Sequence, residues 1–129
     1  MPLLRFDLYK GRSEAETKAL LDAVHGAMLA AFKVPVRDRY QIVHEHSPGT
    51  MIMEDTGLDI PRTDKFVNIQ VTTRPRTREQ KQTFYRLVTE ALQEQCGIAP
   101  ADVMISMVTN SDEDWSFGLG RAQFLTGEL

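Results

Sequence analysis

Apolar and polar residues follow the same order twice along this chain, and the first copy occupies its N-terminal third. Residues 3–9 are rich in strand-forming side chains and predict a strand. Ser13 and Glu16 have the spacing of a capping box, which marks the start of a helix. Apolar residues then recur every three or four positions towards Phe32, as an amphipathic helix requires: Leu20, Leu21, Val24, Ala27, Met28 and Ala31.

A proline blocks any extension of this first helix. Pro35 follows the predicted helix end, and proline cannot continue a helix because it lacks an amide hydrogen. Residues 39–46 predict a second strand. The first copy is therefore a strand, a helix and a strand, in which the two strands are expected to pair in parallel.

The second copy begins in the middle of the chain. Residues 66–71 predict a strand, and Thr77 with Gln80 forms another capping box. Gly97 stops the helix, and residues 103–108 predict the closing strand. The apolar face of this helix consists of Phe84, Leu87, Val88, Ala91 and Leu92.

These two βαβ repeats, residues 2–46 and 66–108, predict an α/β (α+β) fold. Both helices should cover one face of a four-stranded sheet. Asp38 and Asp102 hold equivalent places, just before the closing strand of each repeat. The other face of the sheet is left bare, and we expect it to need a partner because an exposed apolar face is unfavourable in water.

The segments outside the repeats predict irregular structure. Residues 47–64 predict a loop-rich connection with one small strand at residues 51–53. Residues 110–129 predict a C-terminal arm of turns and short strands, with glycine turns at Gly118 and Gly120, that could reach a neighbouring subunit. The length of 129 residues predicts a single domain.

Charge and composition exclude several classes of function. Lys and Arg number 15 against 18 Asp and Glu, so the formal net charge of -3 gives no indication of nucleic-acid binding. The N-terminus reaches charged residues after a short apolar stretch, so we expect no signal peptide, no membrane span and a cytoplasmic location. Cys96, the one cysteine, falls at a predicted helix end and is assigned a structural role.

Two groups near predicted strand ends could take part in chemistry. Removal of Met1 would leave Pro2 as an N-terminal amine, and an α-amino group titrates close enough to neutral pH to act as a base or an acid. Arg74 and Arg76 lie where the third strand gives way to the second helix. Paired guanidinium groups at a helix N-terminus bind carboxylates, with a solvated basic turn as the equal alternative.

Other candidates are ambiguous when each is taken alone. Asp38 has the position of a turn or cap residue, and Trp115 with Phe117 is typical of packing as well as of a site wall. His44 and His46 share one strand face, but a third ligand is not evident, so we expect a polar strand end and no metal.

Together the motifs resemble the malonate semialdehyde decarboxylases of the tautomerase superfamily, over nearly the whole chain. The resemblance implies a tautomerase-like fold and a homotrimer with sites at subunit boundaries. The motifs are Met1-Pro2, Arg37-Asp38-Arg39-Tyr40, Glu54-Asp55-Thr56-Gly57, Arg74-Pro75-Arg76, Asp114-Trp115-Ser116-Phe117-Gly118 and Phe124-Leu125-Thr126-Gly127.

The resemblance also implies a reaction, the decarboxylation of malonate semialdehyde (3-oxopropanoate) to acetaldehyde and carbon dioxide, with no cofactor and no metal. It assigns catalysis to the N-terminal proline, proton or water management to an aspartate, carboxylate binding to the arginine pair, and an apolar wall to two aromatic residues. The proline is Pro2 and the aspartate is Asp38. The arginine pair is Arg74 and Arg76, and the aromatic residues are Trp115 and Phe117.

Three other functions remain open at the level of sequence. The chain could be a keto-enol tautomerase, a hydratase or dehalogenase of three-carbon unsaturated acids, or a non-catalytic trimeric binding protein. Asp38 distinguishes the enzymes, because a nearby carboxylate raises the pKa of the Pro2 amine whereas two arginines lower it. We expect Asp38 to keep Pro2 cationic near pH 7, as decarboxylation or hydration requires.

Overall fold

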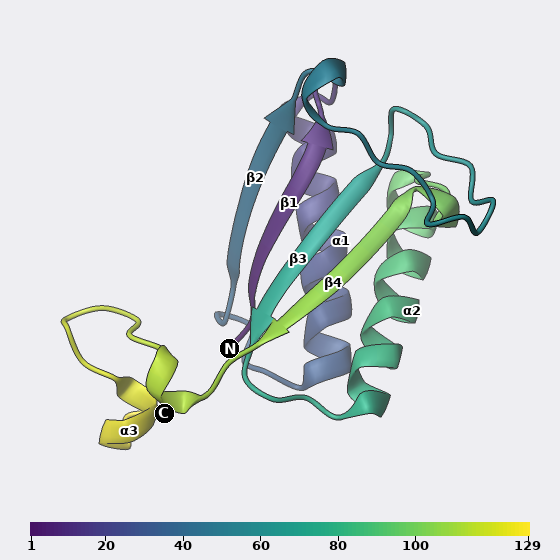
Figure 1. Ribbon diagram of the computed structural model, residues 1–129. Helices are drawn as coiled ribbons and strands as arrows, with labels where there is room; N and C mark the ends of the chain where they lie inside the picture. The colour runs from purple at the N-terminus through teal and green to yellow at the C-terminus, as the bar shows by residue number, and fades with distance from the viewer.

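The computed structural model describes residues 1–129 and contains the two predicted repeats (Figure 1). The first repeat consists of β1 (Leu3–Tyr9), α1 (Glu14–Phe32) and β2 (Tyr40–His46). The second consists of β3 (Val67–Thr73), α2 (Arg78–Cys96) and β4 (Val103–Thr109). Short turns of helix follow or precede them: η1 (Pro48–Thr50), η2 (Pro100–Asp102), η3 (Asp112–Asp114) and α3 (Gln123–Thr126).

Both long helices begin at the predicted capping boxes. The Glu16 amide donates to the Ser13 hydroxyl at 3.1 Å, and Gln80 and Thr77 make the same contact at 3.1 Å. The reciprocal hydrogen bonds from side chain to cap backbone are present in both boxes. These contacts satisfy amides that a helix leaves without partners, so local sequence fixes where each helix starts.

The sheet has the order β2-β1-β3-β4. Strands pair in parallel within each repeat, and β1 pairs antiparallel with β3 at the centre. Both α1 and α2 lie behind the same face of this sheet (Figure 1). The predicted fold of two βαβ repeats with a shared helical layer is therefore confirmed.

The hydrophobic core lies between this face and the helices. Alternate residues of β1 and β3 point into it, as the two-residue period of a strand requires. The helices contribute residues at three- and four-residue spacing. The core includes Leu4, Phe6, Leu8, Val67, Ile69, Val71, Leu20, Val24, Met28, Phe84, Val88 and Leu92.

The opposite face of the sheet is bare, but it is more polar than the sequence analysis expected. On this face Arg5 contacts His44 at 3.0 Å, and His46 contacts Asp7 at 2.8 Å. Asn68 also donates to Asp7, at 3.2 Å. The two histidines that share a strand face are thus engaged by charged residues of β1. A partner on this face would meet polar groups as well as exposed apolar side chains.

Two predictions about the irregular segments are wrong. Residues 51–53 form no strand, although Met51 is buried and its carbonyl accepts from the Tyr9 hydroxyl at 2.6 Å. The C-terminal segment also contains no strand and folds as η3 and α3. Its chain continues away from the end of β4 (Figure 1), so it has no neighbouring strand edge to pair with. No helix of the chain has the length and apolar character that crossing a membrane demands.

Candidate active site

The predicted site residues come from four segments that meet at one end of the sheet. Pro2 is buried at the start of β1, and Asp38 precedes β2. Arg74 and Arg76 lie between β3 and α2, and Trp115 and Phe117 follow η3. The parallel and antiparallel pairings bring these chain ends together, because β1 starts where β3 and β4 finish.

Asp38 is the buried charge of this site. Its side chain is 4% exposed, and neither carboxyl oxygen has a hydrogen-bond partner. Burial raises the pKa of Asp38, against the lowering effects of the N-terminal amine, Arg76 and His25. Since a buried carboxylate is costly without a partner, Asp38 favours a positive charge on the groups that face it.

Arg76 is a half-buried charge that lies near Asp38. Its Nε donates to the Thr73 hydroxyl at 3.1 Å, and its guanidinium lies over the Phe32 ring, 4.7 Å from the ring centre. Burial lowers the pKa of Arg76, as does repulsion from Arg74, whereas Asp38 raises it. The guanidinium is thus oriented by a hydroxyl and an aromatic ring while part of its fork stays free for an anion.

Arg74 is held by a residue of the C-terminal segment. Its Nε donates to an Asp112 oxygen at 2.6 Å, and its guanidinium lies 4.1 Å from the centre of the Phe124 ring. Both partners come from beyond β4. Arg74 is therefore already paired with a carboxylate of this chain, which the sequence analysis did not foresee.

The N-terminal amine lies in the field of these groups. In the chain that retains Met1, its pKa is lowered to about 6, first by burial and then by Arg76, while Asp38 raises it. Arg74 lowers the same pKa and Asp112 raises it. Asp38 and the two arginines thus all act on the pKa of the Met1 amine, whereas the predicted site concerns the amine of Pro2.

The aromatic residues form a stack. The Phe117 ring lies 5.4 Å from Trp115 and 5.8 Å from Tyr40, both nearly parallel to it, and 5.5 Å from Phe124, edge-on. The Trp115 indole nitrogen donates to Asn110 at 2.7 Å. This stack keeps one side of the site apolar.

A cavity of about 390 Å³ opens between the N-terminus and the C-terminal segment. Of the predicted site residues, Asp38 and Phe117 line it, whereas Pro2, Arg74, Arg76 and Trp115 do not. Trp115 therefore supports the wall from behind Phe117. The lining residues are Met1, Pro35, Arg37, Asp38, Tyr40, Phe117, Gln123, Glu128 and Leu129.

Sequence reasoning missed residues that shape this cavity. Gln123 is buried, accepts from the Phe117 amide at 2.9 Å and donates to the Gly118 carbonyl at 2.9 Å, so it fixes the loop that holds the wall. His25 is buried in α1 and contacts the turn before Asp38. The signal for His25 was its spacing, four residues after Leu21 and three before Met28, which places it beside the apolar residues of the predicted helix.

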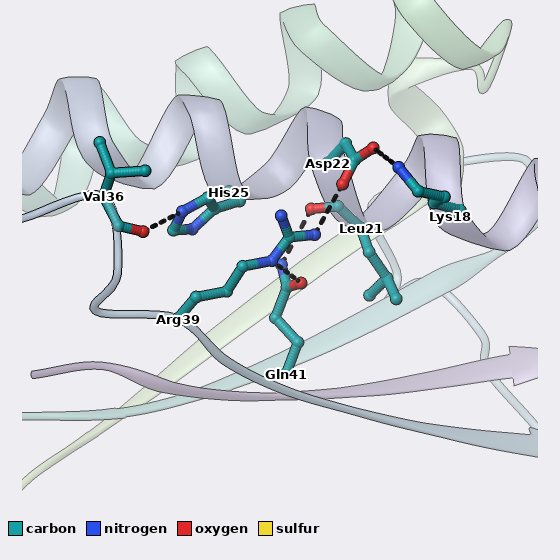
Figure 2. Close-up of polar contacts among 7 residues, drawn as sticks. All are labelled: Lys18, Leu21, Asp22, His25, Val36, Arg39 and Gln41. Carbon is teal, nitrogen blue, oxygen red and sulfur yellow. Dashed lines mark hydrogen bonds and ion pairs between the residues drawn. The ribbon is translucent and has the colours of Figure 1, made fainter.

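Figure 2 shows how α1 holds the segment that leads into β2. His25 contacts the Val36 carbonyl at 2.8 Å, and the Gln41 amide donates to the Leu21 carbonyl at 2.9 Å. Arg39 pairs with Asp22 at 2.8 Å, and Lys18 pairs with the same carboxylate at 2.7 Å. His25 thus holds the turn before Asp38, whereas Arg39 and Gln41 hold the chain after it.

Sequence comparisons place this arrangement in a known class. A tautomerase enzyme family model matches residues 38–118, and a second tautomerase enzyme model matches residues 2–59. The chain belongs to the tautomerase family. A probable tautomerase, YrdN of Bacillus subtilis (strain 168), is 56% identical over 129 residues that cover both chains entirely. The probable tautomerase YusQ of that organism is 34% identical, with 97% of this chain and 99% of the relative covered.

Solved structures show which members of the tautomerase superfamily this chain is similar to. A malonate semialdehyde decarboxylase, described with decarboxylase and hydratase activities, superposes with a TM-score of 0.97 at 57% identity, and 98% of each chain is covered. A second one, inhibited by 3-bromopropiolate, has a TM-score of 0.94 at 44% identity, with 98% of this chain and 97% of the other covered. Fused 4-OT, a trimer at 21% identity and a TM-score of 0.79, shares the fold.

Proposed function

We propose that this protein decarboxylates malonate semialdehyde to acetaldehyde and carbon dioxide, with the Pro2 amine that removal of Met1 exposes. The observation that carries the proposal is the buried Asp38 carboxyl, which has no hydrogen-bond partner and faces the N-terminal amine and Arg76. Such a group favours an amine that stays protonated. The likeness to two malonate semialdehyde decarboxylases supports the same substrate.

The reaction needs a cation at the aldehyde oxygen. Cleavage of the bond between the carboxylate carbon and the methylene carbon releases carbon dioxide and sends the electron pair towards the carbonyl, forming an enolate. The Pro2 ammonium would donate to that oxygen and stabilise the developing charge. A proton then adds to the methylene carbon and gives acetaldehyde. An imine between Pro2 and the aldehyde is the covalent alternative.

Arg74 and Arg76 would hold the substrate carboxylate so that the breaking bond stands out of the carbonyl plane. Arg76 suits this role because its fork is oriented by Thr73 and Phe32. Phe117, backed by Trp115, would give the departing carbon dioxide an apolar surface. Charge at one end of the site and aromatic rings at the other match a substrate anion that becomes a neutral gas.

The decisive test is turnover of 3-oxopropanoate by the chain from which Met1 has been removed, as verified by intact mass. We expect acetaldehyde to form at an enzymatic rate, and a chain that retains Met1 to be inactive because the proline amine is blocked. Equal rates for the two chains, or no acetaldehyde from either, would contradict the proposal.

Keto-enol tautomerisation is a second candidate, favoured by one observation. The pKa of the amine is lowered to about 6 in the chain that retains Met1, and an amine that is neutral at pH 7 can act as a base. The two Bacillus relatives are named probable tautomerases. Turnover of phenylenolpyruvate beside 3-oxopropanoate would show which activity is faster.

We also propose that one domain of residues 1–129 assembles as a homotrimer. The bare sheet face supports this, because Met104 and Val108 are exposed on it, as does the C-terminal segment that projects from the end of β4 (Figure 1). Light scattering should give three times the mass of the chain. A stable monomer would exclude a site at a subunit boundary.

A further inference from the structure

His25 combines burial with an incomplete set of hydrogen bonds. Its side chain is 7% exposed on α1, and its Nε2 lies 2.8 Å from the Val36 carbonyl (Figure 2). Its Nδ1 is buried and has no partner. Because a carbonyl oxygen only accepts, Nε2 must bear a hydrogen, and this contact fixes the tautomer.

The contact reaches the turn that ends at Asp38. Within that turn the Asp38 amide donates to the Pro35 carbonyl at 3.0 Å. The backbone of the turn thus has one hydrogen bond of its own and a second one, at Val36, from His25 on α1. The carboxyl of Asp38 itself has no hydrogen bond that would orient it. Its direction therefore depends on how firmly the turn is held.

The other ring nitrogen of His25 takes no part in this contact. Nδ1 is buried without a partner, whereas Nε2 donates to the Val36 carbonyl. The hydrogen bond from Nε2 is therefore the contact through which His25 acts on the turn.

We propose that His25 is a positioning residue, whose Nε2 hydrogen bond to the Val36 carbonyl holds the Asp38 carboxylate towards the N-terminal amine. This inference rests on the proposed function only for its effect on turnover. Its effect on the amine is independent of any substrate.

Three variants separate this role from general stability. His25→Gln keeps a neutral donor that can reach the Val36 carbonyl, and His25→Leu removes the donor at similar volume. Gln41→Leu is the matched control, because it removes the 2.9 Å hydrogen bond to the Leu21 carbonyl in the same interface, and Gln41 neither lines the cavity nor acts on Asp38 (Figure 2). Where His25→Leu does not fold, His25→Asn, too short to reach the carbonyl, replaces it.

The readouts are the pKa of the Pro2 amine, from NMR titration of its nitrogen, and kcat. His25→Leu should lower the amine pKa by about half a unit, because Asp38 no longer faces the amine, and should reduce kcat about tenfold. His25→Gln should keep kcat within about threefold of wild type and keep the pKa. Gln41→Leu should lower Tm without moving either quantity.

Each alternative result is informative. An unchanged amine pKa in His25→Leu, a His25→Gln variant as impaired as His25→Leu, or the same pKa shift in Gln41→Leu would overturn the proposal. So would unfolding of both His25→Leu and His25→Asn while Gln41→Leu folds, because His25 would then serve stability alone. Absence of 3-oxopropanoate turnover with the expected pKa shifts would contradict the proposed function and leave the positioning role supported.

Discussion

Asp38 and Asp102 occupy the same place in the two repeats and are both buried, yet only one has partners. Asp102 is 2% exposed and accepts from the Thr63 amide at 2.7 Å and from the Thr63 hydroxyl at 2.5 Å. Asp38 is 4% exposed and its carboxyl oxygens accept nothing. In the second repeat the aspartate binds the loop at Thr63, whereas in the first repeat the aspartate has no hydrogen-bond partner and lines the candidate site.

This difference separates stability from chemistry within one fold. Hydrogen bonds from Thr63 compensate the burial of Asp102. Asp38 has no such hydrogen bonds, and only the positive charges around it offset the cost of its burial. Energetically costly groups of this kind persist where function requires them. We therefore expect the two aspartates to respond in opposite ways to substitution.

The largest effect should come from replacing each aspartate by alanine. Asp38→Ala should reduce decarboxylation about a hundredfold with little change in Tm, because it removes a charge that raises the pKa of the amine. Asp102→Ala should lower the free energy of unfolding by about 3 kcal/mol, because two buried donors of Thr63 lose their acceptor. Its activity per folded molecule should stay near wild type.

Chemical denaturation and steady-state kinetics on both variants check this contrast. An Asp38→Ala protein that is as unstable as Asp102→Ala but fully active would reverse the assignment of the two residues. Equal losses of both properties in both variants would mean that the repeats do not differ in the way the hydrogen bonds indicate.

The sequence predicted contacts between residues that are close along the chain, and it did not predict contacts between residues that are far apart along it. Capping boxes at Ser13 and Thr77 are local, so helix starts were predictable from neighbouring residues. The bond from Thr63 to Asp102 spans 39 residues, and that from Arg74 to Asp112 spans 38. No spacing rule reports such contacts. The two aspartates were therefore equivalent in the sequence and different in the fold.

The C-terminal segment shows the same limit. Its glycine turns were predicted, and Gly118 and Gly120 both have positive φ angles of 137° and 69°. The predicted strands were wrong, because a strand needs a neighbour and the alternation of residues alone does not provide one. The aromatic wall was implied by the family resemblance, and the position of Trp115 behind Phe117 required the structure.

A smaller effect on kcat/KM should distinguish Arg74 and Arg76, at the candidate site, from Arg62 in the loop near Asp102. Arg76→Ala should reduce kcat/KM about thirtyfold, and Arg74→Ala about tenfold because Asp112 already shares that guanidinium. Arg62→Ala is the matched control, since Arg62 lies over Phe66 and donates to the Ala101 carbonyl at 2.6 Å, in the loop that Asp102 holds.

Steady-state kinetics with 3-oxopropanoate and a melting curve for each variant provide the measurement. Arg62→Ala should lose stability and keep kcat/KM, while the two site variants should fold normally. Near-normal kinetics in both Arg74→Ala and Arg76→Ala would show that neither guanidinium binds the substrate carboxylate.

The smallest expected effect is a shift of the amine pKa in Asp38→Asn. In the chain that retains Met1 the pKa of the amine is about 6, which is the balance of burial, Arg76 and Arg74 lowering it against Asp38 and Asp112 raising it. Asp38→Asn removes the larger of the two raising charges, so the amine pKa should fall, by about one unit. The matched variant Asp102→Asn should leave the amine pKa where it is.

The sign of the pH dependence then decides the mechanism in the chain that begins at Pro2. An amine is cationic below its pKa, so a reaction that needs the ammonium is fast at low pH and is lost as the pH rises through the amine pKa. For Asp38→Asn this loss should move to lower pH by the same shift that NMR titration of the proline nitrogen records. A rate that instead rises with pH through that pKa would mean that neutral Pro2 attacks the aldehyde, and Asp38 would then slow the reaction by keeping the amine protonated.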